Sequence, residues 1–373
     1  MLKVCTIGIG NAGNQIAELA FSTYNIPGLA INSSQKDLMN VKSIRKMVIG
    51  DERGAGKNRD EAKRFVKEQI MNLLSMEQFT EHIDAHDVVF IVSSIGGGTG
   101  SGMAPIFTDI LSRKFSKKFF ILVEIYPPIK ESIAAQQNGI DYLKEVKDFI
   151  PNAVYMCYDN ERKSDLPTSE MMKLVNKEIV DHIAIIRGDY QYATPYNSID
   201  EKDMLKIIET PGRLAIYEIS DIKEKDLDNK TIEDMLINVI KNESANVELD
   251  RDKIVKRMGV ITNLNEKLNK VFNNNVPNIK ELVGEPVEGF EHIYIGKNDE
   301  TNRCVIIMSG LSVPDDRIQK IIQRIEEGLA ELSRIKESSL LDSTNMSCVK
   351  ELRDTGMKSS NDIDDLEDLF SKY

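Results

Sequence analysis

Apolar and polar positions follow two alternating patterns over the first 160 residues. Short continuous apolar runs, such as KVCTIGI (3–9) and DVVFIVSSI (87–95), predict strands that are buried on both faces. Between such runs lie helical patterns, including NQIAELAFSTY (14–24) and a charged segment at 58–79. Strands that alternate with helices are typical of a parallel sheet covered by helices, so we expect an α/β fold in this half.

A long helical pattern follows at residues 168–187, TSEMMKLVNKEIVDHIAIIR, and its length suits a connector between domains. The second half contains strand-like runs separated by two helical segments, which predicts a smaller α+β domain. The strand-like runs lie at 213–220, 256–264, 290–296 and 302–311. The predicted division is a first domain at 1–167, the connector helix at 168–187, a second domain at 188–338 and a flexible acidic tail at 339–373.

Composition narrows the possible classes of protein. A chain of 373 residues has room for two domains, and its net charge of −12 offers no basic face for direct binding of nucleic acid. The four cysteines are far apart and form no CxxC pair, so we expect reduced thiols and a cytoplasmic protein. No apolar run approaches the roughly 18 residues that span a bilayer, so we expect no membrane insertion.

The sequence GGGTGSG, residues 96–102, contains five glycines directly after a predicted strand and before a predicted helix. Glycine lets backbone N–H groups approach a ligand closely, and the helix that follows adds its positive N-terminal dipole, so the loop favours phosphate binding. We expect Thr99 and Ser101 to cap the helix and to offer hydroxyls to phosphate oxygens or a metal. A tight turn is the alternative, but it needs only one or two glycines.

A second glycine loop, GIGNAGNQI, follows the first predicted strand with the spacing GxGxxG. Alone, it would indicate a Rossmann domain that binds NAD through an acidic residue about 20 residues further on. The next strand instead ends in Asn32, which weakens that interpretation.

A third segment, GDERGAGKN, resembles a Walker A loop but has Asp51 and Asn58 where glycine and Ser or Thr are required. We interpret Gly54 and Gly56 as part of a flexible loop that closes over a terminal phosphate.

Together these loops resemble the tubulin/FtsZ superfamily of GTPases. GNAGNQI is similar to tubulin GQCGNQI, GGGTGSG matches the tubulin glycine signature, and AINSSQKDL is similar to an FtsZ stretch. The resemblance implies a parallel-sheet GTPase domain, a long central helix and a smaller activation domain, with GTP or GDP and Mg²⁺ as cofactors. It implies phosphate and nucleotide contacts from Gly10, Asn11, Ala12, Gly13, Asn14, Gln15, Asn32, Gly54, Gly56, Gly96, Gly97, Gly98, Thr99, Gly100 and Ser101.

The same resemblance implies three contacts to the nucleoside. Asn160 and Asn176 match the family's contacts to guanine, whose N1–H and N2–H₂ donors require acceptor oxygens. Glu131 matches the ribose-binding Glu of FtsZ, although Ala134 and Ala135 replace the arginines that follow it there. The alternative interpretation of each asparagine is a surface or capping residue.

Hydrolysis requires a positioned water, and the glycine loops supply no carboxylate for it. Asp200 and Asp203, in NSIDEKDMLKII, match the family's catalytic acids, which act on the GTP of a neighbouring subunit. Two acids at a helix N-terminus, favoured by the helix dipole, are the alternative interpretation.

The divergent loops and the acidic tail resemble the TubZ branch of the superfamily. That branch implies head-to-tail filaments that move plasmid or phage DNA through a DNA-binding adaptor of the TubR type, bound by the C-terminal tail. An FtsZ-like division GTPase is the alternative within the family, and an NAD-dependent Rossmann enzyme is the alternative outside it. His82 and His86 have i, i+4 spacing without a third ligand nearby, so we predict no metal site formed by protein side chains alone.

Overall fold

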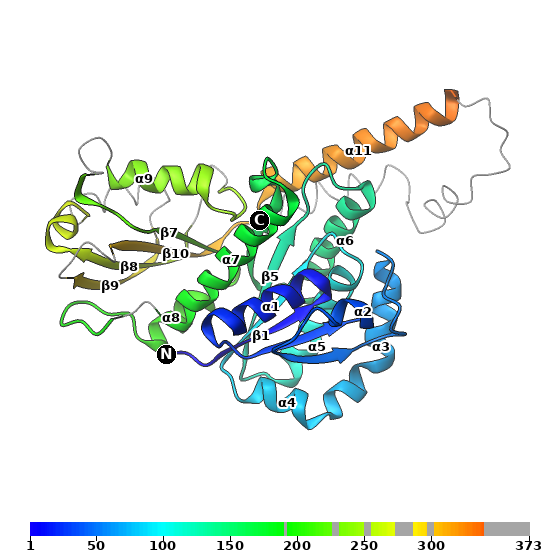
Figure 1. Ribbon diagram of the computed structural model, residues 1–373, viewed down its shortest axis with the longest axis horizontal. Helices are drawn as coiled ribbons and strands as arrows, with labels where there is room; N and C mark the ends of the chain where they lie inside the picture. Colours follow the sequence, from blue (N-terminus) through cyan, green and yellow to red (C-terminus); the bar gives the residue numbers. More distant parts are fainter. Residues whose placement is uncertain (190–191, 226–230, 250–254, 273–285, 297–301, 339–373) are drawn as a thin grey trace.

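The computed structural model describes residues 1–189, 192–225, 231–249, 255–272, 286–296 and 302–338 (Figure 1). Ten strands form one sheet in the order β3-β2-β1-β4-β5-β6-β7-β10-β8-β9. The strands are β1 (Val4–Ile9), β2 (Gly28–Asn32), β3 (Arg45–Val48), β4 (Val88–Ser94), β5 (Phe119–Tyr126), β6 (Val154–Asp159), β7 (Gly212–Ile219), β8 (Arg257–Asn265), β9 (Glu288–Gly296) and β10 (Arg303–Leu311).

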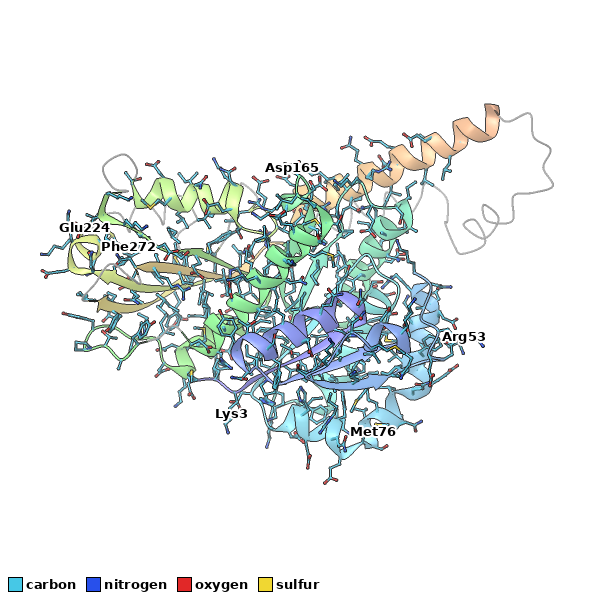
Figure 2. The ribbon with its side chains drawn as sticks, in the orientation of Figure 1. Lys3, Arg53, Met76, Asp165, Glu224 and Phe272 are labelled. Atoms are coloured by element: carbon cyan, nitrogen blue, oxygen red, sulfur yellow. The ribbon has the colours of Figure 1, made fainter. Side chains whose placement is uncertain are left out.

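Helices cover both faces of the sheet. The helices are α1 (Gly10–Tyr24), α2 (Gln35–Leu38), α3 (Arg59–Ser75), α4 (Glu77–Asp84), α5 (Thr99–Lys114), α6 (Ile133–Phe149), α7 (Thr168–Arg187), α8 (Glu201–Ile208), α9 (Ile232–Asn238) and α11 (Asp315–Ser338), with a 3₁₀ turn η1 (Asn160–Lys163) and a π-helical turn η3 (Val239–Glu243). One core lies between the sheet and α1, α7 and α8, and a second lies between the sheet and α3 to α6 with α11. Figure 2 shows the side chains that fill these layers.

The predicted fold class is confirmed. Every pair from β3 to β7 is parallel, as the continuous apolar runs indicate, and successive residues of β4 are buried against opposite faces. One helix differs from expectation: the charged segment at 58–79 is two helices, α3 and α4, because Met76 has extended backbone angles between them.

The second half adds its strands to the same sheet. β6 and β7 pair in parallel over two residue pairs, and β7, β10 and β8 then pair antiparallel, with β9 parallel to β8 at the edge. The helix at Thr168–Arg187 is one continuous α7. The division into domains remains a prediction, since one hydrogen-bonded sheet runs through both halves. Among the described residues, no helix has the length and apolarity to cross a bilayer.

A carboxyl group lies in the middle of the parallel sheet. Glu124 on β5 is 0% exposed, and its register partners are Ser93 on β4 and Cys157 on β6. The thiol of Cys157 lies 3.5 Å from Glu124 Oε2. Burial raises the pKa of Glu124 to about 8, because the charged form loses its hydration.

We predict that Glu124→Gln removes a pH dependence of stability. The raised pKa means that the folded state favours the neutral acid, so this contribution is complete below the ordinary value of 4.5 and is lost as pH rises towards about 8. Wild type should therefore lose free energy of unfolding relative to the variant over that window in urea titrations. Glu68→Gln, at a side chain that is 51% exposed, serves as control. A stability difference that does not change with pH would contradict the prediction.

Candidate functional site

The first glycine loop brings helix α1 against strand β4 with no room for side chains. A Cβ added to Gly13 would lie 2.0 Å from the carbonyl oxygen of Val92, and one on Gly8 would lie 2.3 Å from the carbonyl oxygen of Gly13. Gly10 has φ +76°, in the region that favours glycine. The spacing of glycines therefore serves a close contact of three backbone segments, with α1 starting directly at the end of β1.

The second glycine loop joins β4 to α5, at the same edge of the sheet. Gly98 packs against residue 57, since an added Cβ would lie 2.6 Å from Lys57 Cα. Gly97 differs: the nearest atom to an added Cβ is the carbonyl oxygen of Ser94 at 4.0 Å. Gly97 therefore borders open space beside the loop, as a ligand-binding glycine requires.

The expected capping of α5 by hydroxyl groups is wrong. Its N-cap is Gly98, with no side-chain cap hydrogen bond. The Thr99 hydroxyl lies 2.7 Å from that of Ser33, while the Ser101 hydroxyl donates to the carbonyl of Gly97 and accepts from Arg59 Nε. Ser101 is 0% exposed, so its hydroxyl holds the loop from within.

The starts of α1 and α5 fit an anionic group. Neither N-cap residue, Ile9 or Gly98, supplies a side-chain hydrogen bond, and neither first turn carries an acidic residue. By contrast α3 and α6, from the same half, are capped by Asn58 and Ser132. The first-turn N–H groups of α1 and α5 thus remain for a ligand, and these two helix dipoles both favour negative charge.

The third loop lies against the second. Gly54 N donates to Ser33 O, and Gly54 and Gly56 have φ of +92° and +56°. No atom lies within 4 Å of a Cβ added to Gly56. Lys57 Nζ lies 3.5 Å from Glu131 Oε1, which brings the third loop to the residue predicted to contact ribose.

Two supporting residues were missed by sequence reasoning. Asn138 on α6 donates through Nδ2 to the carbonyls of Lys57, Gly96 and Gly97, which joins the second and third loops. Arg59 is buried and pairs with Glu145 at 2.6 Å while it holds Ser101. No local pattern marks either residue, because their partners lie about 40 positions or more away in the chain.

Several candidate contacts also have structural roles. Asn14 is buried, and its Oδ1 accepts from Ile31 N, so it fixes β2 to α1. Asn32 Oδ1 accepts from Ser34 N at the end of β2. Asn11 is exposed and accepts from Gln15 Nε2, so both side chains lie at the surface beside Ala12.

The candidate nucleoside contacts lie where β6 and α7 approach this edge. Asn160 opens η1 directly after β6, and Asn176 lies in α7. The end of β6, directly before η1, is fixed by a buried ion pair, with Arg317 Nε of α11 donating to Asp159 Oδ2 at 2.6 Å. Arg317 also donates to the carbonyl of Pro127, in the loop that carries Glu131.

Asp200 and Asp203 lie at the opposite end of the sheet. Asp200 caps α8, and the two acids form a capping box in which each side chain accepts the backbone N–H of the other. The N-terminal amine, which precedes β1, lies 2.6 Å from Glu201 of α8, so α8 adjoins the start of β1 (Figure 1). The glycine loops follow the ends of β1 and β4. Figure 2 marks the two ends, with Asp165 before α7 and Lys3 before β1.

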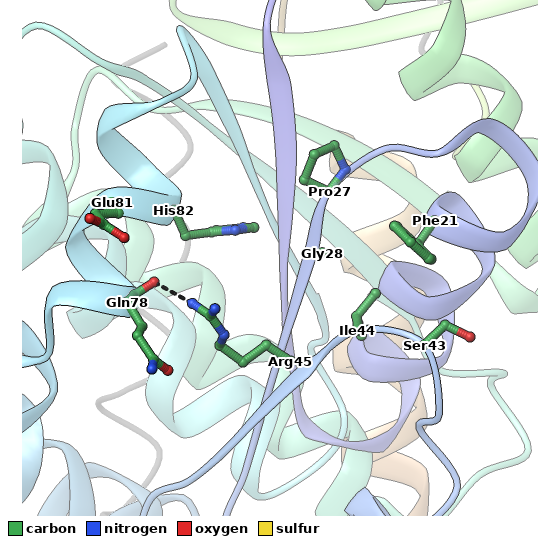
Figure 3. Close-up of a pocket in the computed structure, with 9 residues that line it drawn as sticks. All are labelled: Phe21, Pro27, Gly28, Ser43, Ile44, Arg45, Gln78, Glu81 and His82. Atoms are coloured by element: carbon green, nitrogen blue, oxygen red, sulfur yellow. Dashed lines mark hydrogen bonds between the residues drawn. The ribbon is translucent and has the colours of Figure 1, made fainter.

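A hollow of about 320 Å³ lies apart from the glycine loops (Figure 3). It opens near the start of β2 and β3 and is lined by Phe21, Pro27, Ile44, Arg45 and His82 among others. Arg45 Nη1 donates to the carbonyl of Gln78 on its wall. Burial lowers the pKa of His82 to about 4, and its Nε2 lies 3.3 Å from Thr6 O, so His82 is a neutral structural residue.

The chain is similar in sequence to known tubulin-like proteins. The model of the Tubulin/FtsZ family, GTPase domain, matches residues 3–166. The tubulin-like protein TubZ of Clostridium botulinum C phage is 23% identical over 100% of this chain and 99% of its own length. The tubulin-like protein CetZ of Pyrococcus furiosus is 22% identical over 90% of this chain and 92% of its own.

Two solved structures share the fold. TubZ of Clostridium botulinum phage c-st has a TM-score of 0.72 at 20% identity, covering 88% of this chain and 99% of that one. CetZ2 of Haloferax volcanii, described as a GTPγS-bound protofilament, has a TM-score of 0.72 at 16% identity, covering 89% and 100%. At identities below 25%, these structural similarities establish the fold alone.

We predict that Gly97→Ala weakens GTP binding without changing stability. The added methyl group meets no protein atom closer than 4.0 Å, so it projects into the space beside the loop. Affinity measured by calorimetry should fall about tenfold, equivalent to one weakened hydrogen bond. Gly139→Ala, where the methyl group meets Ile95 at an ordinary 3.5 Å, should bind GTP as wild type does. Unchanged affinity in Gly97→Ala would contradict a ligand at this loop.

Proposed function

We propose that residues 3–166, which match the model of the Tubulin/FtsZ family, GTPase domain, bind and hydrolyse GTP, that the chain polymerises head to tail, and that hydrolysis is completed across the contact between subunits. In this proposal the glycine loops of one subunit bind the triphosphate, and Asp200 and Asp203 of the next subunit orient the attacking water.

The observation that carries the proposal is the separation of loops and acids within one subunit. α7 has 20 residues, which corresponds to about 30 Å of helix. Leu2 N donates to Arg187 O at the end of α7, so this end of the helix adjoins the start of β1. A single subunit therefore has its phosphate-binding loops and its candidate catalytic acids at opposite ends.

Contact between two unlike ends of identical subunits continues without closing unless a rotation forms a ring. A second copy stacked on the glycine loops would bring α8 of that copy to the triphosphate. Hydrolysis would then depend on assembly, and the product would be a filament.

Hydrolysis of GTP requires little covalent chemistry from the protein. Phosphoryl transfer to water requires charge stabilisation and a positioned nucleophile, so first-turn N–H groups of α1 and α5 stabilise phosphate charge while a carboxylate orients water. Mg²⁺ bound together with the nucleotide would neutralise the charge that develops on the phosphate oxygens. Among the described residues, no group of three or more His, Cys, Asp or Glu side chains could hold a metal ion.

Transport of plasmid or phage DNA is the cellular role that we propose. The resemblance to TubZ spans the whole chain, and a net charge of −12 disfavours direct contact with DNA. An adaptor that carries the DNA would bind the acidic tail at 339–373, which lies outside the described residues. Complementary charge would speed that encounter. An FtsZ-like role in division remains the alternative.

We predict that Asp200→Asn keeps GTP binding and filament formation but loses turnover. Asparagine retains the N-cap hydrogen bond of α8 while it removes the charge that orients water. Phosphate release should fall by about a hundredfold or more, the usual contribution of a group that assists proton transfer. Asp234→Asn, in the similar capping box of Thr231 on α9, is the matched control and should hydrolyse GTP normally. Normal turnover in Asp200→Asn would rule out this role.

GTP hydrolysis should also depend on protein concentration. With GTP, we expect a threshold protein concentration at which right-angle light scattering and phosphate release rise together, because the active site forms only between subunits. With ATP or NADH we expect neither to rise. Activity that is proportional to concentration from the lowest value, without scattering, would instead indicate a site complete in one subunit.

Deletion of residues 339–373 should leave polymerisation intact and abolish binding of the DNA-carrying adaptor. Co-sedimentation of filaments with a DNA-binding adaptor of the TubR type measures both effects. Retained binding would refute the assignment of the tail.

A further inference from the structure

A segment of the second half, residues 239–246, lies against the end of β6; we call it the bridging segment. Asp159 N donates to Ala245 O at 2.7 Å, and Val247 N donates to Cys157 O at 2.9 Å, so this stretch extends the edge of β6 beyond its short pairing with β7. The bridging segment begins with η3, a π-helical turn, a rare conformation that is frequent at functional sites.

The bridging segment is bound from one side by η1, the turn that starts with Asn160. Arg162 donates through Nε to Ser244 O at 2.7 Å and through Nη2 to Ile240 O at 2.5 Å. Lys163 Nζ donates to Asn242 O at 3.5 Å. Two cations thus satisfy carbonyl groups at the C-terminal end of a helical turn, where positive charge is favoured.

From the other side it is bound by α7, the helix that carries Asn176. Glu178 Oε1 accepts from Ser244 Oγ at 2.6 Å, both carboxylate oxygens accept from Ala245 N, and Asn246 Nδ2 donates at 3.4 Å. One carboxylate therefore binds three consecutive residues. Burial raises the pKa of Glu178, and the hydrogen bond from Ser244 opposes that shift.

We propose that Glu178 is a positioning residue for guanine: through the bridging segment it fixes the spacing between Asn160 and Asn176. This rests on the proposed function, in which these asparagines contact the base. Guanine offers N1–H and N2–H₂ as adjacent donors, so two acceptors on different elements discriminate well only when their separation is fixed. Asn160 and Glu161 directly precede the two cations, and Asn176 lies two positions before Glu178 on the same rigid helix.

The bridging segment also connects this pair to the second half of the chain. Asn246 Nδ2 donates to Ile216 O on β7 at 2.8 Å, and Arg213 Nη1 donates to Val247 O and Glu248 O. Base recognition and the placement of β7 are therefore linked through shared hydrogen bonds, as expected for coupling carried by a contiguous network.

The test is Glu178→Gln, with affinities for GTP, ITP and ATP measured by calorimetry. ITP lacks the 2-amino group of guanine, so the ratio of GTP to ITP affinity reports the spacing of acceptors at the base. The amide keeps the size of the side chain but loses the charge that supports several hydrogen bonds. We expect the GTP/ITP ratio to fall about tenfold, since hydrogen bonds to charged groups are the stronger ones.

Glu218→Gln is the matched control, because Glu218 on β7 pairs with Arg303 at 2.6 Å and its pKa is also raised by burial. Both variants should lose stability, but only Glu178→Gln should change the GTP/ITP ratio. Ser244→Ala removes one hydrogen bond to Glu178 and should also lower the GTP/ITP ratio. The inference therefore remains testable if Glu178→Gln does not fold.

Equal GTP/ITP ratios in wild type, Glu178→Gln and Ser244→Ala would overturn the inference while leaving the proposed function intact. A wild-type protein that binds ATP as tightly as GTP would overturn the proposed function and, with it, this inference. If Glu218→Gln lowered the GTP/ITP affinity ratio as much as Glu178→Gln does, the effect would be due to general destabilisation. That result would also overturn the inference.

Discussion

The candidate phosphate-binding site depends on close contact between backbones that excludes side chains. Gly13 brings the first turn of α1 to the carbonyl of Val92, and Gly98 brings the start of α5 to the backbone of Lys57. At these separations a methyl group would overlap backbone atoms, which cannot move without displacing a strand or helix. The contact places the ends of two helices without side-chain caps beside each other, and their first-turn N–H groups form the candidate anion site.

The shared direction of the parallel strands determines the edge of the sheet at which each connecting segment lies. Because β1, β4, β5 and β6 run in one direction, the loops that follow them all reach one edge, and the segments that precede them reach the other. The connector α7 returns the chain from the loop edge to the start of β1, where α8 presents its two acids. In the proposed mechanism the catalytic site needs both edges and therefore two subunits, so assembly would follow from the topology of the sheet.

Much of the fold could be predicted from apolar runs, since strands buried on both faces and a helix of 20 residues have strong patterns. The glycine loops were predictable because glycine has few other reasons to cluster. The role of Ser101 was not, because a hydroxyl in a helix start usually caps it, whereas here the backbone of Gly97 and the side chain of Arg59 occupy that hydroxyl. The break at Met76 was missed because the charged pattern continues through it.

The hardest part to predict was the support of the nucleoside side of the site, since it comes from distant parts of the chain. Arg317 and Asp159 are 158 positions apart, yet both side chains are 5% exposed and form one ion pair. Desolvation offsets most of the attraction in such a pair, so its value for stability is small compared with an apolar alternative. Its geometry is specific, however: one guanidinium binds the end of β6 and the carbonyl of Pro127 together. A first half folded alone would lack this guanidinium and leave the Asp159 carboxylate without it. The parallel strands β1 to β6 and the glycine loops therefore belong to the first half, while the candidate nucleoside contacts are positioned by residues of both halves.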